Sequence, residues 1–219
     1  YKTTFILVEL NGYDASKMVD ELAQIKQKGN EIFAGVAKTS VVGEVVNYAE
    51  MNGKIVTGEL KSFAGSFIII AILLILAFTG IKTGLIAMIP NIAPVLFIGG
   101  IMGYFKMSLD MITMTVMPMI LGIAVDDTIH MVNHIKSKLE QGYDYKNAII
   151  LTFREIGKTM AMTTLILCAM FFVFIFSPMT ALSRIGILSI AGLLGALGAD
   201  YTLTPLLIYI LKPYKKNKN

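Results

Sequence analysis

The stretch Pro118-Met-Ile-Leu-Gly-Ile-Ala-Val-Asp-Asp-Thr-Ile-His130 closes a long apolar run with two adjacent aspartates, Asp126 and Asp127. An ionised aspartate near the centre of a membrane helix costs about 2.5–3.5 kcal/mol on insertion scales. Such a group normally faces the interior of a helix bundle, takes up a proton or has a partner. The pair therefore predicts a functional site within a membrane.

The composition agrees with a membrane location. Of the 219 residues, 55% are hydrophobic and 16% charged, and the mean hydropathy is +0.70. An ordinary soluble domain is roughly 25% charged and 45–50% apolar. The net charge of +4 comes from basic residues beside apolar spans and at the C-terminus, so we expect no nucleic-acid partner. Cys168 is the single cysteine, which excludes an internal disulfide, and we expect neither a metal nor an organic cofactor.

Five apolar segments are each long enough to cross the hydrocarbon core as a helix. They are residues 63–78, 85–104, 109–131, 159–176 and 185–210. Lysines and arginines gather in segment 132–158 and in the tail 212–219, which predicts that both are cytoplasmic. Segment 132–158 is amphipathic, and we interpret it as an interfacial helix pair broken near Gly142. An odd number of spans then places the N-terminal segment outside the cytoplasm.

Residues 1–60 predict part of a small α+β domain. Residues 3–10 are rich in β-branched and aromatic residues and are followed by Asn11-Gly12, which is typical of a strand and a turn. Apolar residues at helical spacing predict a helix from Asp14 to Lys28, stopped by Gly29, and residues 32–46 predict a strand or a strand leading into a helix. The chain begins with Tyr, so we expect a fragment of a longer protein.

Polar residues inside the third span share one helix face. Gly122, Asp126, His130 and His134 recur every four residues, and Asp127 lies about 100° around the axis. His130 is either a functional partner of Asp126 or an interfacial histidine. Two carboxylates side by side in a poorly solvated site should not both ionise easily, which is the physical basis of a proton relay.

Other spans carry polar residues at the same depth. At about 1.5 Å per residue from the outer ends of their spans, Asp126, Asp200 and Thr163 all lie roughly 22–25 Å down. We expect one buried polar cluster that takes in Thr163 or Thr164, although a membrane threonine often bonds to its own helix and Asp200 alternatively fixes the bundle. Pro90, Pro94 and Pro118 interrupt helical hydrogen bonding, and small residues in the last span favour close helix packing. The latter residues are Ala191, Gly192, Gly195, Ala196 and Ala199.

These residues resemble the resistance-nodulation-division (RND) superfamily, in its branch of predicted hydrophobe exporters and MMPL-like permeases. The matching motifs are Gly122-x-x-x-Asp126-Asp127 with Thr-Ile-His130, Pro90-Asn91-Ile-Ala-Pro94, the Gly103 to Asp110 segment, and Asp200-x-x-x-x-Pro205. The resemblance covers about residues 54–211. It departs at Thr79 to Gly84, where the family commonly has Arg-Ser.

The resemblance implies a duplicated transporter of twelve helices with porter domains outside, of which this chain looks like the C-terminal half. We therefore expect a proton-driven exporter of lipids or amphiphilic compounds in a cell membrane. Asp126 and Asp127 would carry protons, modulated by His130, Asp200, Thr163 and Thr164. The expected partners are membrane lipid, a hydrophobic substrate and the missing N-terminal repeat, and a homo-oligomer is compatible with the sequence.

Two other functions are compatible with parts of the pattern. A sterol-sensing-like module shares the Gly-x-x-x-Asp-Asp helix by resemblance and would bind lipid without transport. An intramembrane aspartyl protease needs aspartates on two helices and a Gly-x-Gly-Asp signature, whereas the pair here is adjacent and follows Gly-Ile-Ala-Val. The exporter is therefore the leading hypothesis.

Overall fold

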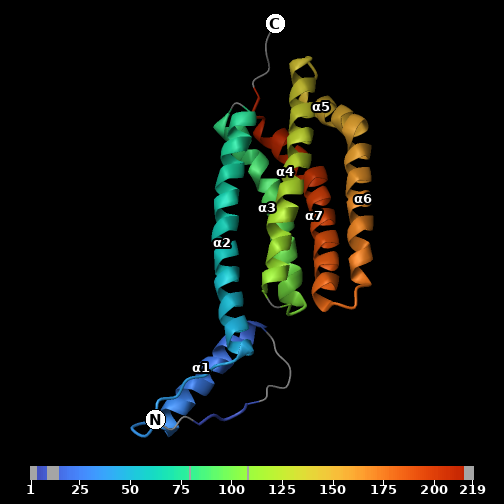
Figure 1. The fold of residues 1–219 in the computed structure, drawn as a ribbon. Coiled ribbons are helices and arrows are strands. Elements are labelled where there is room, and N and C mark those ends of the chain that lie inside the picture. The colour runs from blue at the N-terminus through green and yellow to red at the C-terminus, as the bar shows by residue number, and fades with distance from the viewer. Residues whose placement is uncertain (1–3, 9–14, 79, 108, 215–219) are drawn as a thin grey trace. The chain divides into compact units, whose positions relative to one another are not determined.

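The computed structural model describes residues 4–8, 15–78, 80–107 and 109–214, and the regular elements in these ranges are all helices. The α-helices are α1 (Ala15–Ile32), α2 (Glu44–Ala77), α3 (Ile81–Tyr104), α4 (Met111–Glu140), α5 (Tyr145–Thr152), α6 (Lys158–Ile175) and α7 (Thr180–Leu211) (Figure 1). A short π-helix, η1 (Phe153–Gly157), joins α5 to α6. The chain divides into two compact units, residues 1–58 with 108–111 and residues 59–107 with 112–219.

Five helical segments within the described ranges are long and apolar enough to cross a membrane. They are α2, α3, α4, the continuous run Tyr145–Ile175, and α7. This confirms the prediction of an α-helical membrane protein with five candidate spans. Two helices run far past the apolar segments that predicted them, because α2 begins at residue 44 and α4 continues to residue 140. Residues 132–140 are therefore the end of α4 rather than a separate interfacial helix.

The predicted α+β character of residues 1–60 is not found in the described part of that segment. Residues 4–8 form no strand, and neither do residues 37–43. A strand needs a neighbouring strand to receive its backbone hydrogen bonds, and the described residues provide none. Residues 3, 9 and 10 of the predicted strand and the Asn11-Gly12 turn lie outside the described residues.

Helix α1 runs past its predicted stop. Glycine ends a helix most readily with a positive φ, and that conformation occurs at Gly35, with φ 77°, rather than at Gly29. Gly142, with φ 95°, lies in the turn after α4, where the sequence predicts a break.

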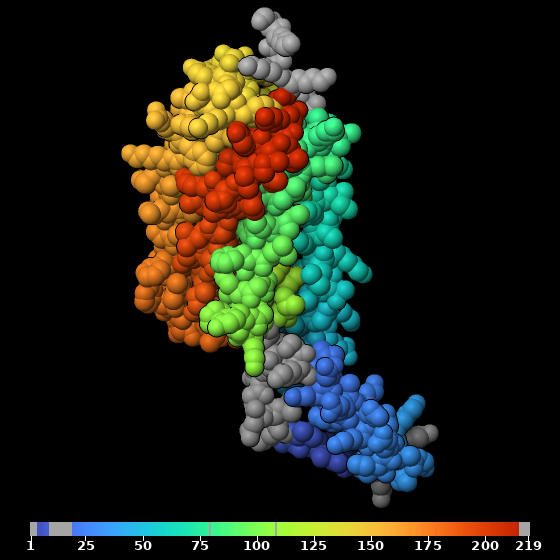
Figure 2. All heavy atoms as spheres, turned by 180° about the vertical axis from the view of Figure 1, so that it is seen from behind, coloured from blue at the N-terminus to red at the C-terminus, as the bar shows by residue number. Residues whose placement is uncertain are grey.

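Helix α7 packs against α3 and α6 (Figure 2). Its small residues let its backbone approach neighbouring side chains closely. A Cβ atom on Gly192 would lie 2.6 Å from Ile98 and 3.0 Å from Ile120, and one on Gly195 would lie 3.0 Å from Phe97. The absence of side chains at these glycines therefore sets how closely α7 approaches α3 and α4.

The π-helix is tied to α7 by Tyr201. The Tyr201 hydroxyl donates a hydrogen bond to the Gly157 carbonyl oxygen, and the Tyr201 ring packs edge-on against Phe153 with centroids 5.3 Å apart. A π-turn leaves backbone groups out of the regular helical ladder, so they need partners elsewhere. Tyr201, the residue directly after Asp200, provides such a partner for the Gly157 carbonyl oxygen.

Replacing Gly84 by alanine tests the close packing between α2 and α3. The added Cβ would lie 2.6 Å from Ile75 Cα and 2.7 Å from Ile75 N, and backbone atoms cannot rotate away. We expect Gly84→Ala to lower the free energy of unfolding by about 1–3 kcal/mol, measured by denaturant unfolding in detergent. Gly99→Ala on the same helix is the control, because its Cβ meets nothing within 4 Å. Equal stability of the two variants would contradict this packing.

Replacing Tyr201 by phenylalanine removes the hydroxyl while keeping the ring. We expect a loss of about 0.5–1.5 kcal/mol, with faster amide hydrogen exchange over residues 153–161. Tyr209→Phe is the control, since the Tyr209 side chain is exposed on the same helix. Unchanged exchange in Tyr201→Phe would show that the hydroxyl does not hold the π-turn.

Candidate functional site

A buried carboxyl group lies at the centre of the helix bundle. Asp200 on α7 is only 1% exposed. The Thr128 hydroxyl on α4 donates a hydrogen bond to Asp200 Oδ1 at 2.6 Å, and the Thr204 hydroxyl, one turn along α7, donates to the same oxygen at 2.9 Å. Side chains of α4 and α7 therefore both donate to one oxygen of the Asp200 carboxyl group.

Helix α3 adds an amide to this cluster. Asn91 is buried, its Nδ2 donates to the Ala87 carbonyl oxygen at 2.7 Å, and its Oδ1 lies 3.4 Å from Thr128 Oγ1. Pro90 and Pro94 are also buried. Because each proline lacks an N–H, two backbone carbonyl oxygens of α3 near Asn91 receive no helical hydrogen bond, although the helix is continuous. Asn91 of the Pro90-Asn91-Pro94 motif therefore adjoins the cluster.

Of the aspartate pair, Asp127 faces the cluster more closely. Asp127 is half-buried and interacts electrostatically with both Asp200 and Tyr201. It directly precedes Thr128, so a shift of α4 moves the hydrogen-bond donor and the second carboxylate together.

Asp126 lies on the exposed side of α4 that carries Pro118, Gly122, Asp126 and His130, which we call the open face of α4. His130 Nε2 lies 3.6 Å from Asp126 Oδ1, and these side chains are 63% and 73% exposed. Gly122 and Pro118 are exposed on the same face, and a Cβ on Gly122 would meet nothing within 4 Å. The predicted shared face of Gly122, Asp126 and His130 is thus present, turned away from the rest of the described chain.

Of the two threonines of α6, Thr163 bonds its own helix. The Thr163 hydroxyl donates to the carbonyl oxygen of Met160 on its own helix at 2.9 Å, and Thr164 is buried. Similar depth in the membrane led us to expect Thr163 near Asp200, but the hydroxyl that bonds Asp200 from another helix is that of Thr128. Two sequence signals could have identified these threonines. Thr204 lies one helical turn after Asp200, and Thr128 directly follows the aspartate pair.

A second polar group lies near the end of α4. Lys138 Nζ is 2.5 Å from Glu155 Oε1 on the π-helix, and His134 Nδ1 is 3.8 Å from Glu155 Oε2. These side chains are partly exposed, where an ion pair contributes only about 0–1 kcal/mol. His134 thus belongs to this end of α4 and does not contact Asp126.

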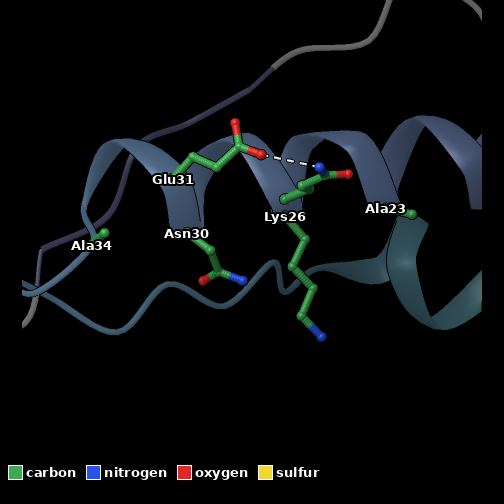
Figure 3. A pocket seen from close by; sticks show the side chains of 6 residues that line it. Ala23, Lys26, Asn30, Glu31 and Ala34 are labelled. Atoms are coloured by element: carbon green, nitrogen blue, oxygen red, sulfur yellow. Dashed lines mark hydrogen bonds between the residues drawn. The ribbon is translucent and has the colours of Figure 1, made fainter.

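The described residues hold no cluster of three or more histidine, cysteine, aspartate or glutamate side chains that would bind a metal ion. Two hollows occur elsewhere. Figure 3 shows one along α1, where Gln27 Nε2 donates to Glu31 Oε1 at 3.0 Å. Its lining comes from α1 and the turn that follows, and its Lys26 and Glu31 side chains point away from each other.

The other hollow, of about 300 Å³, lies beside the end of α7. There the Tyr145 hydroxyl donates to the Tyr214 carbonyl oxygen at 2.6 Å and accepts from the Tyr214 N–H at 3.0 Å, which fixes the chain after α7.

Comparison with known proteins agrees with this architecture. A putative membrane protein of Methanocaldococcus jannaschii is 27% identical over 154 residues, which are 69% of this chain and 40% of that relative. The matched region therefore spans less than half the length of the relative. Residues 2–217 match the MMPL family. With five apolar helices and the aspartate pair on α4, this match confirms the resemblance found in the sequence: the chain belongs to the MMPL family of membrane proteins.

Proposed function

We propose that this chain is half of an RND-type exporter that moves lipids or other hydrophobic or amphiphilic compounds across a cell membrane, driven by protons that pass through Asp126 and Asp127. The observation that carries the proposal is the arrangement of three carboxyl groups within the spans. Asp126 pairs with His130 on the open face, and Asp127 interacts electrostatically with both members of this pair and with the buried Asp200. Membrane carboxylates of this kind are typical of ion pathways.

The arrangement suits stepwise proton transfer. Adjacent carboxylates in a poorly solvated site share protons because two charges there repel each other. His130 is one turn from Asp126, and its Nε2 lies 3.6 Å from Asp126 Oδ1, so an imidazole stands beside that carboxylate. A helix movement that changes which carboxylate is solvated would then load a proton on one side and release it on the other.

The open face of α4 supports a second half that covers it. An aspartate, a histidine and a bare glycine make a poor lipid-facing surface because a charge in hydrocarbon is costly. Gly122 offers instead a close approach for another helix. The curated relative is more than twice as long as its matched region, which leaves room for a second repeat. We assign this chain to the C-terminal half, with its tail in the cytoplasm.

Replacing Asp126 and Asp127 together by asparagine tests the relay. Asparagine keeps the shape of the side chain and cannot take up a proton reversibly. In proteoliposomes of the intact protein with an imposed pH gradient, we expect export of the amphiphilic dye Nile red to fall to the level of protein-free vesicles. Asp144→Asn is the control, because Asp144 lies in the turn before α5 and bonds Asn147.

Full export by the double variant would rule out the relay. Lipid binding by the wild-type protein without any proton-linked dye movement would favour the sterol-sensing-like alternative.

A further inference from the structure

The two oxygens of the Asp200 carboxyl group have different surroundings. Oδ1 accepts hydrogen bonds from Thr128 and Thr204. Oδ2 is fully buried, and within the described residues it has no hydrogen-bond partner. Oδ1 thus accepts two hydrogen bonds, while Oδ2 has none among the described residues.

This asymmetry matches a neutral carboxylic acid rather than a carboxylate. A carboxylate spreads its charge over both oxygens and needs donors on each, and a buried acceptor without a donor costs about 1–3 kcal/mol, more when it is charged. A carboxylic acid has one carbonyl oxygen that accepts and one O–H group, and leaving that neutral O–H group unpaired costs less than leaving a charged oxygen without a donor. Oδ1 occupies the first position and Oδ2 the second.

Among the described residues, no charged group nearby neutralises Asp200. The charged side chain that interacts with it is Asp127 on α4, which has the same sign. On α7 the next residue is Tyr201, whose hydroxyl is used by Gly157. Along the other packed helices, the basic groups lie at helix starts, Lys82 on α3 and Lys158 on α6. A negative charge on Asp200 would therefore be added beside another negative charge.

We infer that Asp200 is a third proton-binding group of this site, which holds a proton on Oδ2 in the present conformation. It passes this proton to Asp127 when α4 moves, because Oδ2 has no hydrogen-bond partner among the described residues here. The inference rests on the proposed function for its role in transport. In the exchange, the O–H bond at Oδ2 breaks and an O–H bond forms on the ionised Asp127. Asp200 becomes the carboxylate and Asp127 the neutral acid, so the net charge of the pair is unchanged.

Thr128 links this exchange to movement of α4. Its hydroxyl donates to Asp200 Oδ1, and its backbone adjoins Asp127. A shift of α4 toward α3 would let the same hydroxyl donate to Asn91 Oδ1, which is already 3.4 Å away. Asp200 would then lose a donor while Asp127 changes position.

Infrared spectroscopy of the intact protein in lipid bilayers tests the inference without requiring a substrate. A protonated carboxylic acid has a carbonyl stretching band that a carboxylate lacks. At neutral pH we expect one such band to disappear in Asp200→Asn and to persist in Asp126→Asn. We expect Thr128→Val to shift the band to higher frequency, because the carbonyl oxygen loses a donor. Thr202→Val is its control, since Thr202 bonds the Gly198 carbonyl on its own helix.

The outcomes separate this inference from the proposed function. If the band is unchanged in Asp200→Asn, Asp200 is ionised and the inference is wrong. A second result would also overturn it: sodium, but not potassium, raises the thermal stability of the wild-type protein, and Asp200→Asn abolishes this effect. Asp200 would then be a sodium ligand. If Asp200→Asn fails to fold, the Thr128→Val shift decides alone. Loss of the band together with full export by the Asp126 and Asp127 double variant would keep Asp200 as a proton-binding group and reject the relay.

Discussion

A carboxyl group inside an apolar helix bundle must be hydrogen-bonded, neutralised or covered, because hydrocarbon provides no water to solvate it. The second unit of this chain is arranged around that constraint. Asp200 receives two hydroxyl donors on one oxygen, and Asp126 has an imidazole one turn away. Asp200 is enclosed by the described residues, whereas Asp126 faces a surface that they leave open.

Close packing of the helices allows the hydrogen bond between Thr128 and Asp200 to form. Thr128 and Asp200 sit on different helices, and a hydroxyl side chain is short, so their backbones must approach closely. Gly192 allows this by leaving room for Ile98 and Ile120, at the level where α7 passes α3 and α4. The glycines and alanines of α7 therefore serve the polar cluster as well as the bundle.

The sequence predicted what depends on position along a helix and failed on what depends on rotation or on partners. Five spans followed from apolar length. The roles expected for Asp126, Asp127 and Asp200 from the cost of burying charge stay predictions; in the structure Asp200 is buried and Asp126 is exposed. Depth alone suggested Thr163 as a neighbour of Asp200, but Thr163 bonds its own helix and Thr128 takes that place. The strand expected at residues 3–10 failed in its described part because β-propensity supplies no pairing partner.

The most direct test of the account is whether protein covers the open face of α4 in the intact molecule. A spin label on Gly122→Cys, in a Cys168→Ser background, reports collisions with oxygen dissolved in the lipid. A label on Leu165→Cys serves as the lipid-facing reference, since Leu165 is exposed on α6. The account predicts far fewer collisions at residue 122 than at residue 165. Equal collision rates would place Asp126 and His130 against lipid and contradict it.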